Sequence, residues 1–406
     1  MSDRPDAALA LQYEAHPYPV RDPADEARRL ILGSPSHLRE IDHWAFAARR
    51  PASRPMRVLV AGGGTGDATV MLATQMERAN RPGDITHLDR STAALDIARA
   101  RVAARGLQSR VTFVEGSLLD PLDQAFDYVD CCGVLHHLAD PAEGLAALVA
   151  MLEPGGAMGL MVYAPHGRTG VYMAQDALRF LAPATAPMSA RIDAARRLLK
   201  HLPEGAWLRR NRSVTDHIAG GDAGLVDLLL NPRDQAFTID RFLALLADAG
   251  LAPTCLLEPL RYDPDPYLPD PKLRAAAAPL DPVARAALAE AVSGTMSTHV
   301  VYCRRATDPL PAPDPLAERA IPVIREGTGD ALAAAIRPDD TWLFTSEALN
   351  TSVALPRLAR PILRAIDGTA TVAEIAEKIG AGFERAWPPL FAKLNAANRL
   401  LLAPPP

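Results

Sequence analysis

The 406-residue sequence predicts an α/β fold, a seven-stranded, mostly parallel β-sheet with helices on both faces. From Met56 onward, apolar runs of strand length alternate with helical segments. The gaps between these runs are long enough for the helical crossovers that parallel strands need. A glycine loop, Gly62–Gly66, follows the first run directly, where sheets of this kind bind ligands.

Seven segments have strand character, and helices are predicted between them. The predicted strands are Arg57–Ala61, Ile85–Asp89, Val111–Glu115, Tyr128–Cys132, Ala157–Tyr163, Thr254–Leu260 and Thr298–Arg304. The predicted helices are Ala68–Met76, Thr92–Ala104, Glu143–Leu152, Thr238–Ala249 and Pro282–Val292. Gly250 follows the fourth helix directly and supplies a C-terminal stop signal.

The chain divides into several predicted parts. Residues 1–55 form an N-terminal lid and helical segment, with a helix over Ser36–Arg50. Residues 56–306 contain the sheet, and within them residues 168–250 form a helical cap insertion. A proline-rich linker over residues 307–320 leads to a small helical domain over residues 321–406.

Composition excludes several classes of protein. The sequence is 49% hydrophobic and 22% charged, which is typical of globular chains and excludes disordered or fibrous ones. The net charge of −5 offers no bulk attraction for nucleic acid. Apolar stretches shorter than a membrane span, and an N-terminus without an apolar signal core, predict a cytoplasmic protein without membrane association. The four cysteines lack CxxC spacing, so we expect neither a disulfide framework nor a zinc site.

The glycine loop discriminates between cofactor classes. Its sequence is Gly62-Gly-Gly-Thr-Gly-Asp67, and Asp67 stands where a dinucleotide fingerprint requires its third glycine. A carboxylate there would repel a diphosphate, so the loop favours a nucleoside cofactor without phosphate. A phosphate-binding P-loop is excluded because no Gly-Lys-Ser/Thr follows.

Asp89 ends the second predicted strand, 89 − 66 = 23 residues after Gly66. A carboxylate at this position can accept hydrogen bonds from both hydroxyls of a ribose. The alternative is that Asp89 only caps the helix that begins near Ser91.

Five ordered motifs resemble those of class I S-adenosylmethionine (SAM)-dependent methyltransferases, which have a Rossmann-like fold. They are the glycine loop, Asp89, Val111–Asp120, Phe126–Leu138 and Leu152–Gly156, and the resemblance extends over residues 56–306. It implies SAM as cofactor, with the following binding residues: Gly62, Gly63, Gly64, Thr65, Gly66, Asp67, Asp89, Arg90, Ser117, Leu118, Cys132 and Gly133. The sequence departs from the family at Val60 and Ser117, where an acid is common. We expect Asp67 or main-chain carbonyls to bind the cofactor in place of these two acids.

Methyl transfer from SAM is an in-line displacement that mainly requires alignment, with a base for a protonated nucleophile. The candidate bases are His136 and His137, which follow the fourth strand, and the alternative is that they pack beneath the next helix. His137 and Asp140 have the spacing of metal ligands, but two ligands do not make a site, so we predict no metal. Candidate acceptor-binding residues are Tyr13, Tyr18, Tyr163, His166 and Arg168. The alternative for Arg168 is an ordinary solvated arginine.

The C-terminal region resembles small winged-helix or leader-peptide-binding domains. Its segment Ile362–Ile379 has helical periodicity around Asp367-Gly368, and Thr371 with Glu374 predicts a capping box. A third helix is expected over Pro388–Asn398. DNA binding is disfavoured because Thr371–Ile379 carries two glutamates and one lysine.

Together these features predict a SAM-dependent methyltransferase acting on a small organic acceptor. One alternative is a peptide or protein methyltransferase that docks its substrate on the C-terminal domain. The other is a SAM-binding sensor or scaffold without catalysis.

Overall fold

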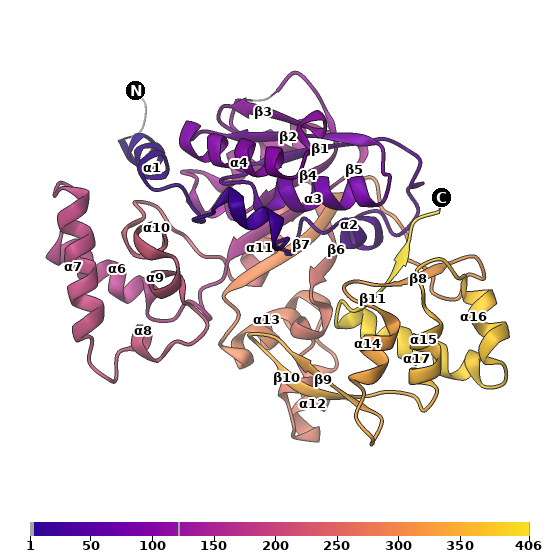
Figure 1. Ribbon diagram of the computed structural model, residues 1–406. Coiled ribbons are helices and arrows are strands. Elements are labelled where there is room, and N and C mark those ends of the chain that lie inside the picture. The colour runs from indigo at the N-terminus through magenta and orange to yellow at the C-terminus, as the bar shows by residue number, and fades with distance from the viewer. Residues whose placement is uncertain (1–3, 121, 406) are drawn as a thin grey trace.

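The computed structural model describes residues 4–120 and 122–405. A seven-stranded sheet forms its centre, in the order β3-β2-β1-β4-β5-β7-β6, with β7 antiparallel to both neighbours (Figure 1). The strands are β1 (Met56–Ala61), β2 (Gly83–Asp89), β3 (Val111–Glu115), β4 (Phe126–Cys132), β5 (Leu152–Tyr163), β6 (Leu251–Leu257) and β7 (Thr298–Arg305). The predicted Rossmann-like, mostly parallel sheet is confirmed.

Both faces of the sheet are covered, because successive side chains of a strand point to opposite sides. Leu59 of β1 packs with α5 (Pro141–Ala150), α11 (Ile239–Asp248) and α13 (Pro282–Ser293). Val58 and Val60 face the opposite core, with α3 (Asp67–Arg78) and α4 (Thr92–Ala104). A strand buried on both faces explains why the β1 sequence is a continuous apolar run.

The N-terminal segment differs from the prediction. Helix α1 (Arg4–Ala15) was not expected, and the predicted helix over Ser36–Arg50 is only α2 (Leu38–Glu40) and a π-helical turn, η2 (Ile41–Ala45). Ala47 and Ala48 adopt φ values of 52° and 53°, which right-handed helices exclude. The helix therefore ends several residues early. A short 3₁₀ turn, η1 (Pro23–Ala27), lies between α1 and α2.

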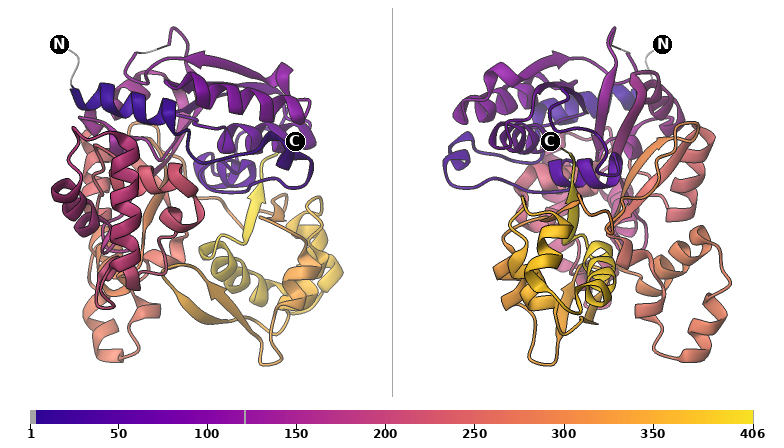
Figure 2. Two further views of the ribbon diagram at one scale, coloured as in Figure 1. Left: turned by 60° about the vertical axis from the view of Figure 1, so that its left-hand side comes forward. Right: turned by 90° about the vertical axis from the view of Figure 1, so that its right-hand side faces the viewer.

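The helical insertion follows β5 and has its own apolar cluster, which includes Val171, Leu178, Val226 and Leu229. It consists of α6 (Val171–Leu181), α7 (Met188–His201), α8 (Trp207–Arg210), α9 (Asp216–Ala219), α10 (Gly221–Leu225) and the π-helical turn η5 (Val226–Leu230). Figures 1 and 2 show it on the opposite side of the molecule from the C-terminal region. Helix α12 (Pro271–Ala277) and two 3₁₀ turns lie between β6 and α13.

The C-terminal region forms a separate core around Phe344 and Trp387. Its elements are β8 (Ile321–Ile324), α14 (Gly329–Ala334), β9 (Thr341–Thr345), β10 (Asn350–Ala354), α15 (Ala359–Ala365), α16 (Val372–Ile379), α17 (Phe383–Ala396) and β11 (Leu400–Ala403). Strands β8 and β11 pair antiparallel, as do β9 and β10. The predicted capping box at Thr371 and Glu374 is present, whereas α17 begins five residues before the predicted helix.

Polar contacts attach this region to the segment that precedes the sheet. The buried carboxylate of Glu40 binds Arg325 and accepts hydrogen bonds from Asn398 (2.6 Å) and the Tyr302 hydroxyl (2.7 Å). The ring of His43 contacts the Asn395 amide at 2.8 Å. These contacts attach the C-terminal region to α2 and η2 and, through Tyr302, to β7 of the sheet.

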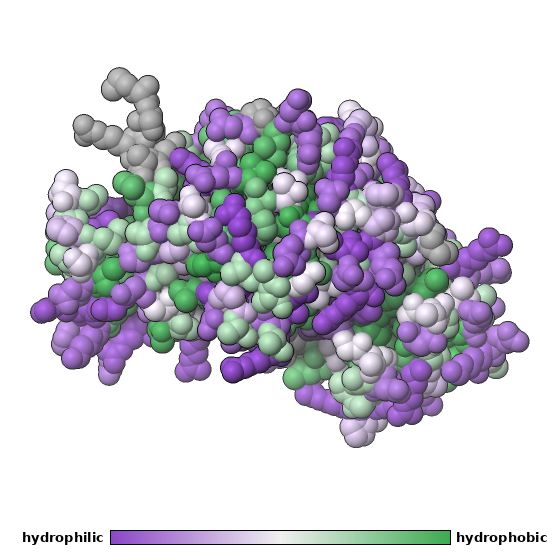
Figure 3. Space-filling model, turned by 45° about the horizontal axis from the view of Figure 1, so that its top comes forward, coloured by the Kyte–Doolittle hydropathy of each residue, from purple (hydrophilic) through white to green (hydrophobic). Residues whose placement is uncertain are grey.

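Among the described residues, the structure contains no helix both long and apolar enough to cross a bilayer. On the face drawn in Figure 3, hydrophobic residues form small patches separated by hydrophilic ones.

Candidate functional site

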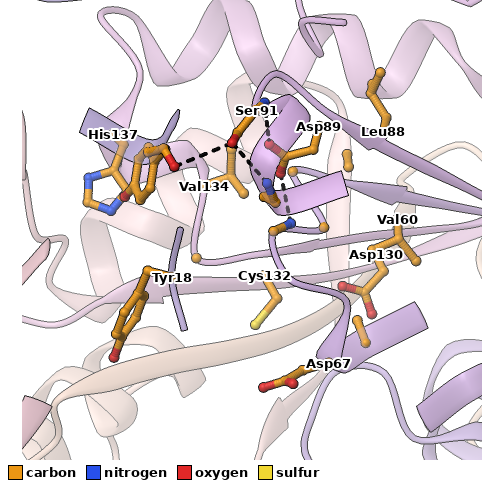
Figure 4. Close-up of a pocket in the computed structure, with 18 of the residues that line it drawn as sticks. Tyr18, Val60, Asp67, Leu88, Asp89, Ser91, Asp130, Cys132, Val134 and His137 are labelled. Atoms are coloured by element: carbon orange, nitrogen blue, oxygen red, sulfur yellow. Dashed lines mark hydrogen bonds between the residues drawn. The ribbon is translucent and has the colours of Figure 1, made fainter. Parts of the chain in front are cut away.

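A cavity of about 400 Å³ lies at the carboxyl ends of β1, β2 and β4 (Figure 4). The strand order reverses at β1 and β4, because β2 lies on one side of β1 and β4 on the other. Crevices at such reversals are the usual ligand sites of α/β sheets. Ten of the residues predicted to bind a cofactor line it: Gly62, Gly63, Gly64, Asp67, Asp89, Arg90, Ser117, Leu118, Cys132 and Gly133.

The glycine loop presents bare backbone to the cavity. Gly64 has φ +52°, and a Cβ there would lie 2.9 Å from the carbonyl oxygen of Tyr18. A Cβ on Gly63 would come within 2.4 Å of the His87 ring. Side chains at these positions would clash, so the loop requires glycine for its own packing as well as for a close ligand.

Thr65 and Gly66 differ from the prediction, because neither is among the residues that line the cavity. The Thr65 hydroxyl donates to the carbonyl of Pro19 at 2.7 Å. Gly66 precedes α3 with φ +97°, and a Cβ there would meet Ala98 at 2.9 Å. Gly66 allows the turn into α3 to pack closely on α4, and Thr65 fastens the N-terminal segment to the loop.

Asp89 lies on the cavity wall and is held by two backbone amides. Its carboxylate accepts hydrogen bonds from Gly64 N (2.7 Å) and Ser91 N (2.9 Å), drawn in Figure 4. Burial raises the pKa of Asp89, and the amides offset part of that rise. The cap of α4 is Ser91, whose hydroxyl accepts from Ala94 N at 3.1 Å. Asp89 is therefore oriented toward the cavity and is not the helix cap.

Asp67 also lines the cavity, but two arginines bind its carboxylate. Arg21 lies 2.6 Å and Arg101 2.7 Å from it. Burial raises the pKa of Asp67, but these cations outweigh burial and hold it below its usual value. Arg101 also pairs with Glu26 at 2.7 Å. Asp67 thus anchors the N-terminal segment, and its charge is already compensated.

Asp130 was missed by the sequence interpretation. It lies on β4 directly opposite Val60 of β1, lines the cavity, and is fully buried. Neither carboxylate oxygen has a hydrogen-bond partner among the described residues. Burial raises its pKa to about 7, and Ser36 offsets part of the rise. The available signal was a single acid inside the apolar run Tyr128–Cys132.

The two histidines have different surroundings. His137 lines the cavity, and its Nδ1 lies 2.8 Å from the carbonyl oxygen of Arg233. A carbonyl only accepts, so Nδ1 carries a proton and Nε2 is the ring nitrogen left to face other groups. His136 is not among the lining residues; it stacks on Tyr163 with ring centroids 3.8 Å apart. Burial lowers the pKa of His136, so His136 is a neutral packing residue and only His137 has the position of a base.

Three tyrosines and a second missed acid form another part of the site. Tyr13 of α1 and Tyr163 of β5 donate to the buried Asp227 carboxylate at 2.8 and 3.4 Å. Tyr18 donates to Asp216 at 2.9 Å. Tyr13, Tyr18, Tyr163 and Asp227 all line the cavity. The lid expected from the two N-terminal tyrosines is therefore joined to the helical insertion.

His166 and Arg168 are not among the lining residues, contrary to the prediction for an acceptor site. The Arg168 guanidinium forms a salt bridge with the fully buried Asp234 side chain at 2.7 Å and lies over the Tyr163 ring. His166 has a side chain that is 45% exposed and faces Glu290. Arg168 supports Tyr163 from behind and is not free to bind an acceptor anion.

The fold and this arrangement define a Rossmann-like nucleoside-cofactor site of the methyltransferase type. Residues 59–158 match the family model described as a methyltransferase domain. The chain therefore contains a class I SAM-dependent methyltransferase domain.

Several proteins from other organisms are similar in sequence to part of this chain. An uncharacterised protein of Synechococcus is 30% identical over 65% of this chain and 63% of its own length. The tRNA 5-carboxymethoxyuridine methyltransferase of Escherichia coli is 31% identical over 36% of this chain and 56% of its own. The demethylmenaquinone methyltransferase of Deinococcus radiodurans is 35% identical over 30% of this chain and 48% of its own. In each case the match spans less than two thirds of the relative.

Among solved structures, PKMT2 from Rickettsia typhi has a similar fold over most of the chain. The TM-score is 0.62 at 16% identity, and the match covers 91% of this chain and 75% of that one. This likeness concerns the fold alone.

Proposed function

We propose that this protein transfers the methyl group of SAM to a small organic acceptor. Support comes from one cavity that has Gly62–Gly64 and Asp89 on its wall together with Tyr13, Tyr163 and Asp227. A shared cavity brings donor and acceptor together, which is the main requirement of a displacement. PKMT2 from Rickettsia typhi, which has a similar fold, has been solved with AdoHcy, the demethylated cofactor.

The proposed cofactor contacts follow from the lining. Gly62, Gly63 and Gly64 would receive the methionine part against bare backbone, Asp89 would accept both ribose hydroxyls, and the adenine would lie against Ser117–Leu118. When bound, SAM supplies a methyl group already activated by its positive sulfur. The carboxylate of Asp89 is preoriented by two amides, so little ordering is required when a ribose binds.

The proposed acceptor contacts involve the remaining wall. His137 would take the proton from an acceptor hydroxyl or amine through Nε2, because its Nδ1 is engaged by the Arg233 carbonyl. Tyr13 and Tyr163 would contact the body of the acceptor, with Asp227 fixing both hydroxyls. We assign the helical insertion, α6 to η5, as the acceptor cap because it contributes Asp227 and Asp216. Helix α11, the last part of the predicted insertion 168–250, packs on the sheet instead.

A small acceptor is favoured over a peptide by the position of the cavity. Every described residue that lines it lies between Leu9 and Asp227. The C-terminal region is attached elsewhere, around Glu40 and His43. The relatives named above act on a tRNA nucleoside and on demethylmenaquinone by their names, so they do not favour one acceptor size.

Calorimetric titration with SAM and with S-adenosylhomocysteine is the first test, and we expect micromolar binding of both. Transfer is then measured with methyl-labelled SAM and a panel of small hydroxyl, amine and carbon acceptors. Label in a low-mass product supports the proposal. Failure to bind either cofactor form contradicts it, and binding without transfer to any acceptor favours the sensor alternative.

The peptide alternative needs a separate experiment. Truncation near residue 310 is unsuitable, because it would leave the buried Glu40 without Arg325 and Asn398. Exchanging the charges of the exposed Glu377 and Lys378 on α16 keeps the chain whole and its net charge constant. Unchanged methylation of the small acceptor supports our proposal. Selective loss of label from a protein or peptide fraction would favour docking on this domain.

A further inference from the structure

Asp130 is a buried acid on the wall of the cofactor cavity, where the Ser36 side chain is a polar neighbour but no cation among the described residues pairs with it. Its relative exposure is 0%, and both oxygens lack hydrogen bonds among the described residues. A carboxylate taken out of water without a donor or a cation is costly. Folded proteins retain such groups where a ligand supplies the missing charge or where the group itself acts.

Asp130 lies beside the position on β1 where this chain has Val60 in place of the acid that is common in the family. Val60 and Asp130 are register partners on the parallel strands β1 and β4, two residues before Gly62 and Cys132 respectively. Partners in register project toward the same face of a sheet, and both residues line the cavity (Figure 4). Asp130 therefore lies on the strand next to position 60, where related sequences often carry an acid and this chain has valine.

Other acids of the cavity are already engaged. Asp67 is bound by Arg21 and Arg101, and Asp89 accepts two amides at the far end of the glycine loop. The ionisable side chains that interact electrostatically with Asp130 are neutral or acidic, so none offers it a cation; they are Tyr128, Cys131, Cys132 and Tyr302. Glu40 lies behind Tyr302, and Ser36 is the polar neighbour from the segment before α2.

We propose, resting on the function proposed above, that Asp130 binds the α-ammonium group of the SAM methionine part. The carboxylate that β1 lacks at Val60 is supplied by the neighbouring strand β4 across the point where the strand order reverses. Asp130 is thus a cofactor-binding residue, and the ammonium group would supply the partner that its buried oxygens lack among the described residues.

The test compares two ligands that differ at this contact. S-adenosylhomocysteine carries the ammonium group, whereas 5′-methylthioadenosine has the same nucleoside and sulfur but no amino acid. We expect Asp130→Asn to weaken S-adenosylhomocysteine binding about 10- to 100-fold in calorimetry, the range of a charged hydrogen bond. Binding of 5′-methylthioadenosine should change less than about twofold. Equal losses for both ligands, or no loss for either, would overturn the assignment.

Two further variants make the comparison specific. An exchange variant, Val60→Asp with Asp130→Val, moves the carboxylate one strand over and should restore most of the S-adenosylhomocysteine affinity. Asp67→Asn should affect both ligands alike, because Asp67 anchors the N-terminal segment. If Asp67→Asn instead removes only the preference for S-adenosylhomocysteine, Asp67 is the ammonium ligand and the proposal is wrong.

The wild-type protein provides a test that needs no variant. Because burial raises the pKa of Asp130 to about 7, an ammonium ligand should expel close to one proton at pH 6. Calorimetry in two buffers of different ionisation enthalpy measures this number, and a value near zero for S-adenosylhomocysteine would overturn the proposal. If the wild-type protein binds neither ligand, the proposed function is overturned as well. If it binds S-adenosylhomocysteine without releasing a proton, and Asp130→Asn binds equally well, only the Asp130 assignment is overturned.

Discussion

The hydroxyl of Tyr13 donates a 2.8 Å hydrogen bond to Asp227, joining residues 214 positions apart in the sequence. Tyr13 lies on the N-terminal helix and Asp227 in the helical insertion, so this bond closes the cavity between two parts outside the sheet. Asn231 contacts the same hydroxyl at 3.3 Å, and Ser91 at the start of α4 donates to the Tyr13 carbonyl. The N-terminal helix is therefore bound both to the helical insertion and to the start of α4.

Removing that hydroxyl should loosen the lid. Tyr13→Phe leaves the buried Asp227 with one tyrosine donor fewer, and we expect the free energy of unfolding to fall by roughly 1–3 kcal/mol. Tyr18→Phe is the matched control, because its partner Asp216 belongs to a less buried helix and its loss should cost less. Urea denaturation measures both. A larger loss for Tyr18→Phe would show that Asp227 is not the main attachment.

Asp89→Ala should weaken SAM on the order of 2–4 kcal/mol by removing two charge-assisted hydrogen bonds to the ribose. Asp89→Asn keeps the shape and one acceptor, so its loss should be intermediate. Calorimetry of the three proteins gives the order directly. Wild-type affinity in both variants would mean that the ribose is bound elsewhere.

Variants of His137 and His136 should have different effects, one on the transfer rate and the other on stability. Among the described residues, His137 is the only histidine that lines the cavity, and we expect His137→Ala to lower the transfer rate about 100-fold with SAM affinity unchanged. His136→Ala instead removes a ring stacked on Tyr163 and should lower thermal stability. Single-turnover rates, SAM titrations and melting curves distinguish the two. Equal rates in wild type and His137→Ala would make His137 a packing residue.

Asp130 should make the stability of the ligand-free protein depend on pH. Its folded pKa of about 7 lies above the ordinary value of 3.8, so the native state binds the proton more tightly than the unfolded chain. The contribution is therefore most favourable below pH 4 and is lost as the pH rises to about 7, at up to about 1.4 kcal/mol per unit. Asp130→Asn should remove this slope. Denaturation from pH 5 to 8 measures it, and parallel curves would contradict the prediction.

Arg168→Ala should destabilise the fold by about 3–5 kcal/mol, because it leaves the fully buried Asp234 without its cation. Arg168→Ala combined with Asp234→Ala should recover part of the loss. Urea titration of the single and double variants tests this. If Arg168→Ala instead has normal stability and a raised KM for the acceptor, Arg168 binds the acceptor, as the sequence predicted.

Much of the fold was predictable because local rules determine it. Strand length, apolar runs and the glycine loop placed the seven strands of the central sheet, and the predicted strand Val111–Glu115 and helix Thr92–Ala104 match the structure residue for residue. The four strands β8 to β11 were not predicted, because the C-terminal region was expected to be helical. The predicted helix over Ser36–Arg50 failed because Ala47 and Ala48 take positive φ values, which sequence propensity does not anticipate. Helix α1 was missed because its stability depends on its contacts with the body of the protein, including Glu14 with Ser91 at 2.8 Å.

By itself, the sequence determined the parallel sheet, the nucleoside-type glycine loop and the position of Asp89, since each depends on neighbours within a few residues or on a strand followed by a turn. Only the tertiary structure decided which charges are free. Asp67 is neutralised by Arg21 and Arg101, Arg168 by Asp234, and Asp130 by no described residue. The physical reason is that burial and ion pairing join residues distant in the chain, and the energy of a charge depends on those partners.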